Sequence, residues 1–282
     1  MFEVIDHRLI AAPGNATPVQ FEASPNVNAS TIAAQFLVFH YTACSFAAAR
    51  AVFMRGTGDG RVSAHLLIDT NGSVTQFVPF NKRAWHAGES FWAGMTDLNT
   101  HSIGIEVVNL GYLLKHGDGR FGSADGSSTV SADQVVEARH KNPHEHHRYW
   151  QAYTPAQIET CTQLAVVLRA AYNLVDVVGH DDIAPARKSD PGPAFPLRHM
   201  VASAFGRADD ETSTQWLFVG AAKLNIRQGP GTQFPLVAAA LPVNTAVRPL
   251  QPSQGGWMQV EAQATPPVVG WVSAAYLRAT VM

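Results

Sequence analysis

Three short apolar segments, separated by stretches of hairpin and helical character, limit the folds available to this chain. FLVFHY (Phe36–Tyr41), SIGIEVVNLG (Ser102–Gly111) and LVDVV (Leu174–Val178) are rich in the β-branched and aromatic residues that favour buried strands. A helical pattern that begins at Thr154 separates the second segment from the third. Strands interleaved with helices predict an α/β fold, with a mixed central sheet flanked by helices.

The helix has several start signals. Thr154 is a favoured N-cap, Pro155 is tolerated in the first turn, and Gln157 completes a capping box. Apolar side chains then recur at helical spacing along one face, at Ile158, Cys161, Leu164, Ala165, Leu168 and Tyr172. Earlier in the chain, Asn71-Gly72 separates two apolar runs and predicts a β-hairpin.

The length of 282 residues favours two domains. We expect a first domain at 1–207, with an irregular polar lead-in at 1–30. Residues 114–150 are rich in Gly, Ser, Asp and His and predict a long surface insertion. A polar linker at 208–215 precedes short β-type segments, broken by Gly and Pro, at 216–282. These segments predict a small all-β barrel domain.

Composition excludes several classes of function. A net charge of -2 argues against a nucleic-acid partner held by charge. No run of ~18 apolar residues is present, so no membrane span is expected. Two cysteines are too few for a disulfide framework, and we interpret Cys44 and Cys161 as free thiols. The N-terminus lacks a standard secretory signal. We expect a monomer.

The segment GHDDIAPARKSDPGPAF, at 179–195, concentrates groups that carry chemistry. Its prolines argue against a helix and favour a stiff extended path. Alternate side chains of an extended segment share a face, so Lys188 and Asp190 point the same way, and Arg187 and Ser189 point away. His180 follows the third apolar run, and we expect it to end that strand. A histidine and an aspartate presented in this way are candidate metal ligands.

A catalytic zinc site needs three protein ligands and an open fourth position. His40 ends the first apolar strand and shares a face with Phe36 and Val38, so it is the candidate third ligand beside His180 and Asp190. The alternative is a core histidine whose ring is satisfied by a backbone carbonyl.

Glu106 is the candidate general base, because a carboxylate on an apolar strand is costly unless it is paired or solvated. Gly104 lies on the same face of that strand, and we expect it to leave open space for a substrate. The alternative for Glu106 is a structural ion pair.

The motifs FHYTA, VSAHLLIDTNGSVTQFVPFNKRAWHAG, SIGIEVVN and GHDDIAPARKSDPGPAF together resemble those of the zinc-dependent N-acetylmuramoyl-L-alanine amidases of the amidase type 2 family. The family includes recycling amidases, phage amidase lysozymes and peptidoglycan recognition proteins. The resemblance covers about residues 30–200. It implies that Zn²⁺ is the cofactor and that its ligands are His40, His180 and Asp190. It also implies that Glu106 activates the attacking water and that Lys188 stabilises the oxyanion.

The resemblance further implies hydrolysis of the amide bond between N-acetylmuramic acid and the L-alanine of the stem peptide. Peptidoglycan or its muropeptide fragments would then be the partner. The alternatives are a cytoplasmic amidase that recycles anhydro-muropeptides, a non-catalytic peptidoglycan-binding protein, and a different zinc peptidase. The complete ligand set favours an enzyme. We expect it to act at the cell wall, and the lack of a visible signal leaves a cytoplasmic location open.

Further residues near these motifs have two interpretations each. The resemblance places His65, His86 and Trp85 near the substrate cleft, whereas the alternatives are support of the hairpin for the histidines and core filling for Trp85. HKNPHEHHR, at 140–148, resembles the HExxH metal motif but fails it, and we interpret it as part of a solvated insertion. We interpret Cys44 as a small buried filler rather than a fourth ligand.

The C-terminal segments LNIRQGPGTQFPLVAAAL, GGWMQV and GWVSAAYL resemble bacterial Src-homology-3-like domains. Such modules often bind cell-wall peptides, and the resemblance implies that role here. The alternative is a structural appendage of the first domain.

Overall fold

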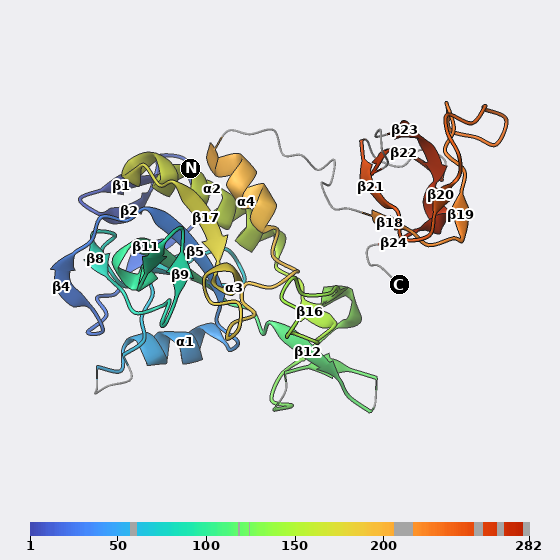
Figure 1. Cartoon of the computed structure of the whole chain (residues 1–282). Helices are drawn as coiled ribbons and strands as arrows, with labels where there is room; N and C mark the ends of the chain where they lie inside the picture. Colours follow the sequence, from blue (N-terminus) through green and yellow to red (C-terminus); the bar gives the residue numbers. More distant parts are fainter. Residues whose placement is uncertain are drawn as a thin grey trace. The chain divides into compact units, whose positions relative to one another are not determined.

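The structure is a computed structural model, and it divides the chain into two compact units, Met1–Arg207 and Ala208–Met282 (Figure 1). Each unit has its own hydrophobic core. The linker expected at 208–215 lies outside the described residues. Those residues are 1–56, 61–117, 119–123, 125–205, 217–250, 256–263 and 268–278.

The first unit is built on a six-stranded mixed sheet, as the sequence predicts. Across the sheet the strands are β17 (Asp176–Gly179), β5 (Phe36–Tyr41), β11 (Ser102–Val107), β6 (Leu66–Ile68), β7 (Val74–Gln76) and β3 (Val19–Phe21). The first four of these strands run parallel, β7 is antiparallel to β6, and β3 runs parallel to β7. The β6–β7 hairpin turns at the predicted Asn71-Gly72.

One face of the sheet packs against two helices, α2 (Pro155–Tyr172) and α4 (Leu197–Phe205), which lie side by side in Figure 1. The predicted capping box of α2 is present, since Thr154 and Gln157 bond reciprocally. The apolar face of α2 meets the side chains of β5 and β11 that point toward it. The buried residues shared in this core include Leu37, Phe39, Ile103, Ile105, Cys161, Leu164, Leu168 and Met200.

The opposite face of the sheet carries two separate apolar clusters. Helix α1 (Phe46–Phe53) covers the part around Leu67, and a second cluster forms around Phe36 and Val38. His40 and Glu106 lie on this face, near the carboxyl ends of two parallel strands. Ligand sites of open α/β sheets lie at that edge, so the fold brings polar groups to a place where a ligand can reach them.

The N-terminal residues are not the irregular lead-in that their composition predicts. Strands β1 (Phe2–Ile5) and β2 (Arg8–Ala11) form a hairpin whose Phe2 and Leu9 enter the main core. Asp6 and His7 both have positive φ, at 49° and 62°, as a type I′ turn requires. The turn lacks the Asn-Gly or Asp-Gly pair that would have revealed it. Strand β3 then completes the edge of the central sheet.

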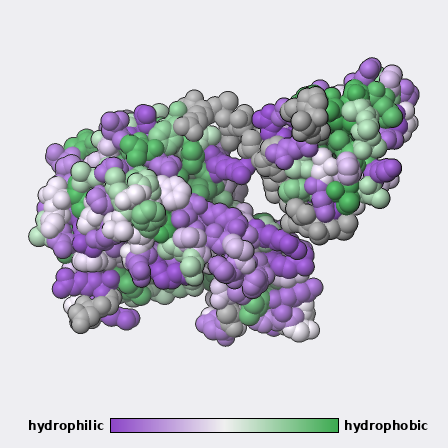
Figure 2. Space-filling view, in the orientation of Figure 1, coloured by the Kyte–Doolittle hydropathy of each residue, from purple (hydrophilic) through white to green (hydrophobic). Residues whose placement is uncertain are grey.

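The insertion that follows β11 folds into an antiparallel sheet of its own and is only partly the solvated excursion expected. His144 and His146 are exposed, and Figure 2 shows a largely hydrophilic surface over β12 and β16. Trp150, in contrast, is fully buried. The elements of the insertion are β12 (Tyr112–Lys115), β13 (Phe121–Gly122), β14 (Thr129–Val130), η2 (Ala132–Gln134), β15 (Val135–Glu137) and β16 (Tyr149–Gln151).

The remaining short elements of the first unit are β4 (Asn28–Thr31), β8 (Lys82–Arg83), β9 (Phe91–Trp92), β10 (Met95–Thr96), η1 (Leu98–Thr100) and α3 (His180–Ile183). Cys44 and Cys161 are both free, as expected, and Cys161 is buried in the main core.

The second unit is a small all-β domain, as predicted. A five-stranded antiparallel sheet curls around a core that includes Val219, Ile226, Val247, Val260 and Val272 (Figure 1). Among the described helices of the chain, none has the length and apolarity needed to cross a bilayer. The elements of this unit are β18 (Leu217–Val219), β19 (Lys223–Leu224), β20 (Leu241–Pro242), β21 (Ala246–Pro249), β22 (Trp257–Ala262), β23 (Val268–Ser273), η3 (Ala274–Tyr276) and β24 (Leu277–Arg278).

Candidate active site and metal centre

Two histidines and an aspartate from distant parts of the chain meet at one buried point. His40 Nδ1 lies 2.9 Å from His180 Nδ1 and 3.0 Å from Asp190 Oδ2, and His180 Nδ1 lies 2.9 Å from the same Asp190 oxygen. Within the described residues this is the group whose ligand atoms are close enough to hold a metal ion. The structure therefore brings together all three predicted metal ligands.

His180 reaches this point from a helix and not from the end of a strand. Strand β17 ends at Gly179, and His180 is the first residue of the one-turn helix α3. The expectation that the prolines exclude helix from this segment is wrong for its start, because the first proline, Pro185, lies beyond the end of α3.

The hydrogen bonds around the two histidines fix where their protons lie. His180 Nε2 lies 2.9 Å from the carbonyl oxygen of Ala87, to which it donates, so its Nδ1 carries a lone pair. The Ser102 hydroxyl donates to the carbonyl of Leu98, so its oxygen accepts from His86 Nε2. His86 Nδ1 therefore accepts from His40 Nε2, at 3.0 Å, and His40 Nδ1 is also unprotonated.

Two lone pairs and a carboxylate oxygen thus converge on one point without a proton between them. Burial, followed by the proximity of His180, lowers the pKa of His40 to about 4, so this ring stays neutral at neutral pH. Three such donor atoms repel one another unless a cation lies between them. Two imidazole nitrogens and one carboxylate are a donor set that suits Zn²⁺, so the residues present fit the ion that the sequence implies.

His86 occupies the space that we expected Gly104 to leave for a substrate. A Cβ atom added to Gly104 would lie 2.3 Å from Cγ of His86, so the imidazole ring rests directly on the glycine. The backbone N–H groups of His86 and Ala87 both donate to Asn99 Oδ1, at 2.9 and 2.8 Å. The absence of a side chain at Gly104 therefore serves the histidine that orients His40.

This close approach predicts the effect of a single methyl group. Gly104→Ala should force the His86 ring away from β11, and overpacking of this kind typically costs ~1–3 kcal/mol of folding free energy. Thermal unfolding would measure the loss, and Gly117→Ala is the control, since nothing lies within 4 Å of the added atom there and its φ lies outside the left-handed region. Equal stability of Gly104→Ala and the parent would contradict the packing described.

Glu106 lies directly opposite His40 in the register of the parallel strands β11 and β5. Its Oε2 atom is buried and accepts no hydrogen bond from the described residues. Burial, together with the nearby Asp190 charge, raises the pKa of Glu106 well above its usual value, and Lys188 opposes this effect. A carboxylate with a raised pKa and an unoccupied oxygen is suited to accept and return a proton.

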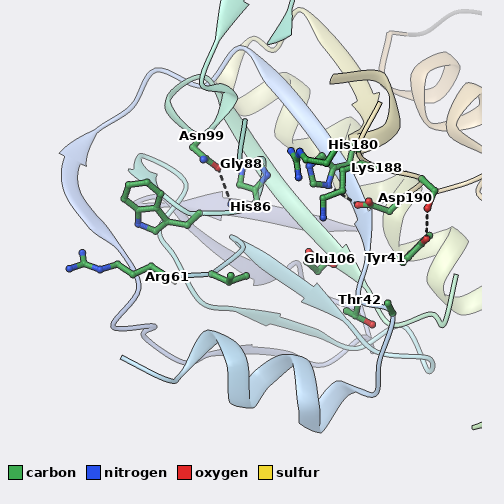
Figure 3. A pocket seen from close by; sticks show the side chains of 15 residues that line it. Tyr41, Thr42, Arg61, His86, Gly88, Asn99, Glu106, His180, Lys188 and Asp190 are labelled. Atoms are coloured by element: carbon green, nitrogen blue, oxygen red, sulfur yellow. Dashed lines mark hydrogen bonds and ion pairs between the residues drawn. The ribbon is translucent and has the colours of Figure 1, made fainter. Parts of the chain in front are cut away.

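Glu106 and Lys188 open onto a cavity of about 550 Å³ that His180 and Asp190 of the metal-binding cluster also line. Figure 3 shows His180, Lys188 and Asp190 gathered at one end of this cavity and Arg61 at the other. Arg187 and Ser189 line the cavity as well, contrary to the strict alternation expected. The reason is that Lys188 N bonds back to the carbonyl of Ala184, so the chain turns before it extends.

The three residues expected near the substrate differ in position. His86 and Trp85 line the cavity, and His65 does not. His65 is fully buried, accepts from the Gly104 N–H at Nδ1 and lies 2.9 Å from the Lys82 carbonyl at Nε2. Both of its ring nitrogens are occupied, so His65 supports the hairpin and is not carried into the substrate site. The guanidinium of Arg83 lies 4.1 Å from the centre of the Trp85 ring.

Several residues of the site escaped sequence reasoning. Tyr41 lines the cavity, and its hydroxyl lies 2.8 Å from Ser189 Oγ. Its position next to His40 was the available signal. Asn99 holds the backbone of His86 and Ala87. It gave no signal in the sequence, because it lies 13 residues after His86 and 12 after Ala87, and only the fold brings them together. Cys44 lies outside the metal-binding group and packs against the cluster under α1, although it is half-buried and not the buried filler expected.

Comparison with known proteins places the chain in a family. The family model described as N-acetylmuramoyl-L-alanine amidase (Amidase_2) matches residues 30–193, which is more than half of the chain. The chain therefore belongs to the Amidase_2 family. The match contains all three residues of the metal-binding cluster together with Glu106 and Lys188.

Two individual relatives are amidases by name. The chain is 33% identical over 195 residues to the N-acetylmuramoyl-L-alanine amidase AmiD of Escherichia coli, a match that spans 66% of this chain and 59% of AmiD. It is 39% identical over 140 residues to the 1,6-anhydro-N-acetylmuramyl-L-alanine amidase AmpD of the same organism, spanning 48% of this chain and 54% of AmpD. The chain thus matches less than two thirds of the length of either relative.

Among solved structures, the complex of E. coli AmiD with anhydro-N-acetylmuramic acid-L-Ala-D-gamma-Glu-L-Lys aligns with a TM-score of 0.44 and 29% identity. The alignment covers 72% of this chain and 65% of AmiD.

Proposed function

We propose that this chain is a zinc-dependent peptidoglycan amidase that hydrolyses the amide bond between N-acetylmuramic acid and L-alanine. The observation that carries the proposal is that a three-donor metal-binding cluster, a half-buried carboxylate and a lysine meet at one cavity, which His180, Asp190, Glu106 and Lys188 line. Membership of the Amidase_2 family and the names of the chain's relatives support the choice of substrate.

His40, His180 and Asp190 would hold the zinc ion. Bound there, Zn²⁺ supplies Lewis acidity, which polarises a carbonyl group and lowers the pKa of a bound water toward ~7. The hydrogen bonds from His40 to His86 and from His180 to Ala87 keep both rings in the tautomer that this role requires.

The remaining groups of the cavity move the proton and balance the charge. The Glu106 carboxylate takes a proton from the water that attacks the amide carbon, and Lys188 stabilises the negative charge that develops on the carbonyl oxygen. Glu106 then gives the proton to the leaving nitrogen as the C–N bond breaks. The products are the free carboxylate of the lactyl group and the free amine of L-alanine.

Mass spectrometry of the products tests this function. Digestion of intact sacculi and of a purified anhydro-muropeptide should release stem peptides with a free N-terminal L-alanine. Cleavage of the soluble fragment alone would favour the recycling alternative, which similarity to a 1,6-anhydro-N-acetylmuramyl-L-alanine amidase also supports. New termini within the stem peptide would indicate a zinc peptidase, and binding without turnover would indicate a receptor.

The second unit gives a further prediction, because we propose that it is a Src-homology-3-like module that binds the cell wall. A chain truncated after residue 207 keeps every proposed catalytic group. Its turnover of a soluble muropeptide should be nearly unchanged, whereas its activity on sacculi should fall by ~10²-fold or more, since tethering raises the effective concentration. Equal losses on both substrates, with 216–282 failing to sediment with cell walls, would make the module a structural support.

A further inference from the structure

The loop between α3 and Asp190 carries two of the proposed functional side chains on backbone that is neither helix nor strand. Residues 184–187 form a bend and a turn, and 188–190 have no regular secondary structure. The two ends of the loop are joined by the Asp181 N–H, which donates to the Asp190 carbonyl at 2.7 Å. Lys188 and Asp190 both lie in the C-terminal part of this loop. Their positions therefore depend on what holds this backbone.

Two buried side chains of the insertion bond to that backbone. The Asn142 side-chain amide donates to the carbonyls of Asp181 and Pro185, at 3.0 and 3.2 Å, and its nitrogen lies 3.5 Å from the carbonyl of Lys188. His140 Nε2 lies 3.1 Å from the carbonyl of Ser189. His140 Nδ1 accepts from the Asn142 N–H, so Nε2 carries the proton that the ring donates to Ser189, and Asp181 Oδ2 lies 3.0 Å from the same Nε2.

The insertion is itself anchored firmly enough to act as a support. His140 stacks on Trp150, with ring centres 5.5 Å apart and planes 30° apart. The Trp150 ring packs against Gly192, where an added Cβ would lie 3.0 Å away. At the base of the insertion, the Asn109 side chain donates to the carbonyl of Gln151 at 3.2 Å. The insertion therefore contacts the loop itself, through His140, and the chain just beyond it, through the packing of Trp150 against Gly192.

Charge adds to this attachment. Lys141, between the two buried residues, lies 2.9 Å from Asp181 Oδ1 and 2.5 Å from Asp182 Oδ1. Three consecutive residues of the insertion therefore contact the loop or the helix turn that leads into it. Their neighbours His144 and His146 are exposed.

We propose that His140 and Asn142 are positioning residues, which hold the 181–189 backbone so that Asp190 converges with His40 and His180 and Lys188 faces the cavity. The inference rests on the proposed function for its activity readout only. Without these hydrogen bonds the loop samples other conformations, the third metal ligand is displaced part of the time, and Lys188 loses its alignment with the developing charge.

The test compares variants that remove the donors while keeping bulk. Asn142→Leu deletes the amide, and His140→Phe keeps the stacking on Trp150 but cannot donate to Ser189. Each should weaken zinc binding by ~10–100-fold in competition with a chelator. Hydrogen exchange of a peptide that covers 181–190 should be faster in the metal-free protein. Turnover of a muropeptide should fall in kcat with little change in KM.

Two further variants complete the test. His144→Ala, on the exposed part of the same turn, should match the parent in every measurement. His140→Gln, whose amide can again donate to Ser189, should restore much of the zinc affinity lost in His140→Phe. Variants that unfold at lower temperature but keep the zinc affinity and the exchange of 181–190 unchanged would overturn the proposal. If the parent fails to cleave muropeptides, the proposed function fails, and the zinc and exchange measurements still decide this inference.

Discussion

Glu106→Gln should lower kcat for muropeptide hydrolysis by ~10²–10⁴-fold, because the amide keeps the shape of the side chain but cannot accept a proton. Zinc content should stay the same, since Glu106 lies outside the three-donor cluster. The variant should also be at least as stable as the parent. In the parent, a buried carboxylate oxygen of Glu106 has no hydrogen-bond donor, which is unfavourable, and the substitution removes its charge. Functional sites often keep such unfavourable groups at a cost in stability.

Glu159→Gln provides the matched control, because this exposed carboxylate on α2 lies away from the cavity. It should leave kcat, zinc content and the unfolding temperature unchanged. Near-normal turnover in Glu106→Gln would show that another group activates the water, and Glu106 would then be a structural residue.

Replacing a metal ligand should have the second large effect. Asp190→Ala should reduce zinc content from one per chain toward none and abolish turnover, because two neutral imidazoles alone hold the ion weakly. In the parent protein, zinc at 100 times its dissociation constant should add ~2.7 kcal/mol to the free energy of unfolding. This stabilisation should be largely absent in Asp190→Ala and can be measured by thermal unfolding with and without zinc.

His146→Ala is the control for this experiment, because His146 is an exposed histidine outside the cluster. It should bind zinc like the parent. Chelation of the parent should stop turnover, and added zinc should restore it. A variant that lacks His40, His180 and Asp190 together but still binds one zinc per chain would falsify the ligand assignment.

The central sheet and the metal-binding cluster were predictable because their signals are local. Each strand of the site is a short apolar run, and a histidine that interrupts or follows such a run is visible in the sequence at once. His40 and His180 are both of this kind, and Asp190 stands in a proline-rich motif with strong family resemblance. The periodicity and capping of α2 likewise need no tertiary information.

Other features depend on contacts between segments far apart in the chain. The buried roles of His140 and Asn142 come from carbonyl groups about 40 residues further along, so their polar, His-rich surroundings indicated only a solvated insertion. The empty side of Gly104 predicted open space, although a ring from another segment fills it. The N-terminal hairpin uses a turn made by Asp6 and His7, a pair with no strong turn preference.

The pairing of β5 with β11 has a consequence for how this chain can change its length. Because His40 and Glu106 are lateral neighbours on parallel strands, about 4.8 Å of sheet spacing separates their backbones. Deleting one residue within β11 would turn the Glu106 carboxylate to the face covered by α2 and α4, and deleting one within β5 would do the same to His40. Insertions in the connecting loops leave that spacing untouched. The two paired strands therefore fix the distance between the base and the metal-binding cluster, and the length of the chain can vary outside these strands without changing that distance.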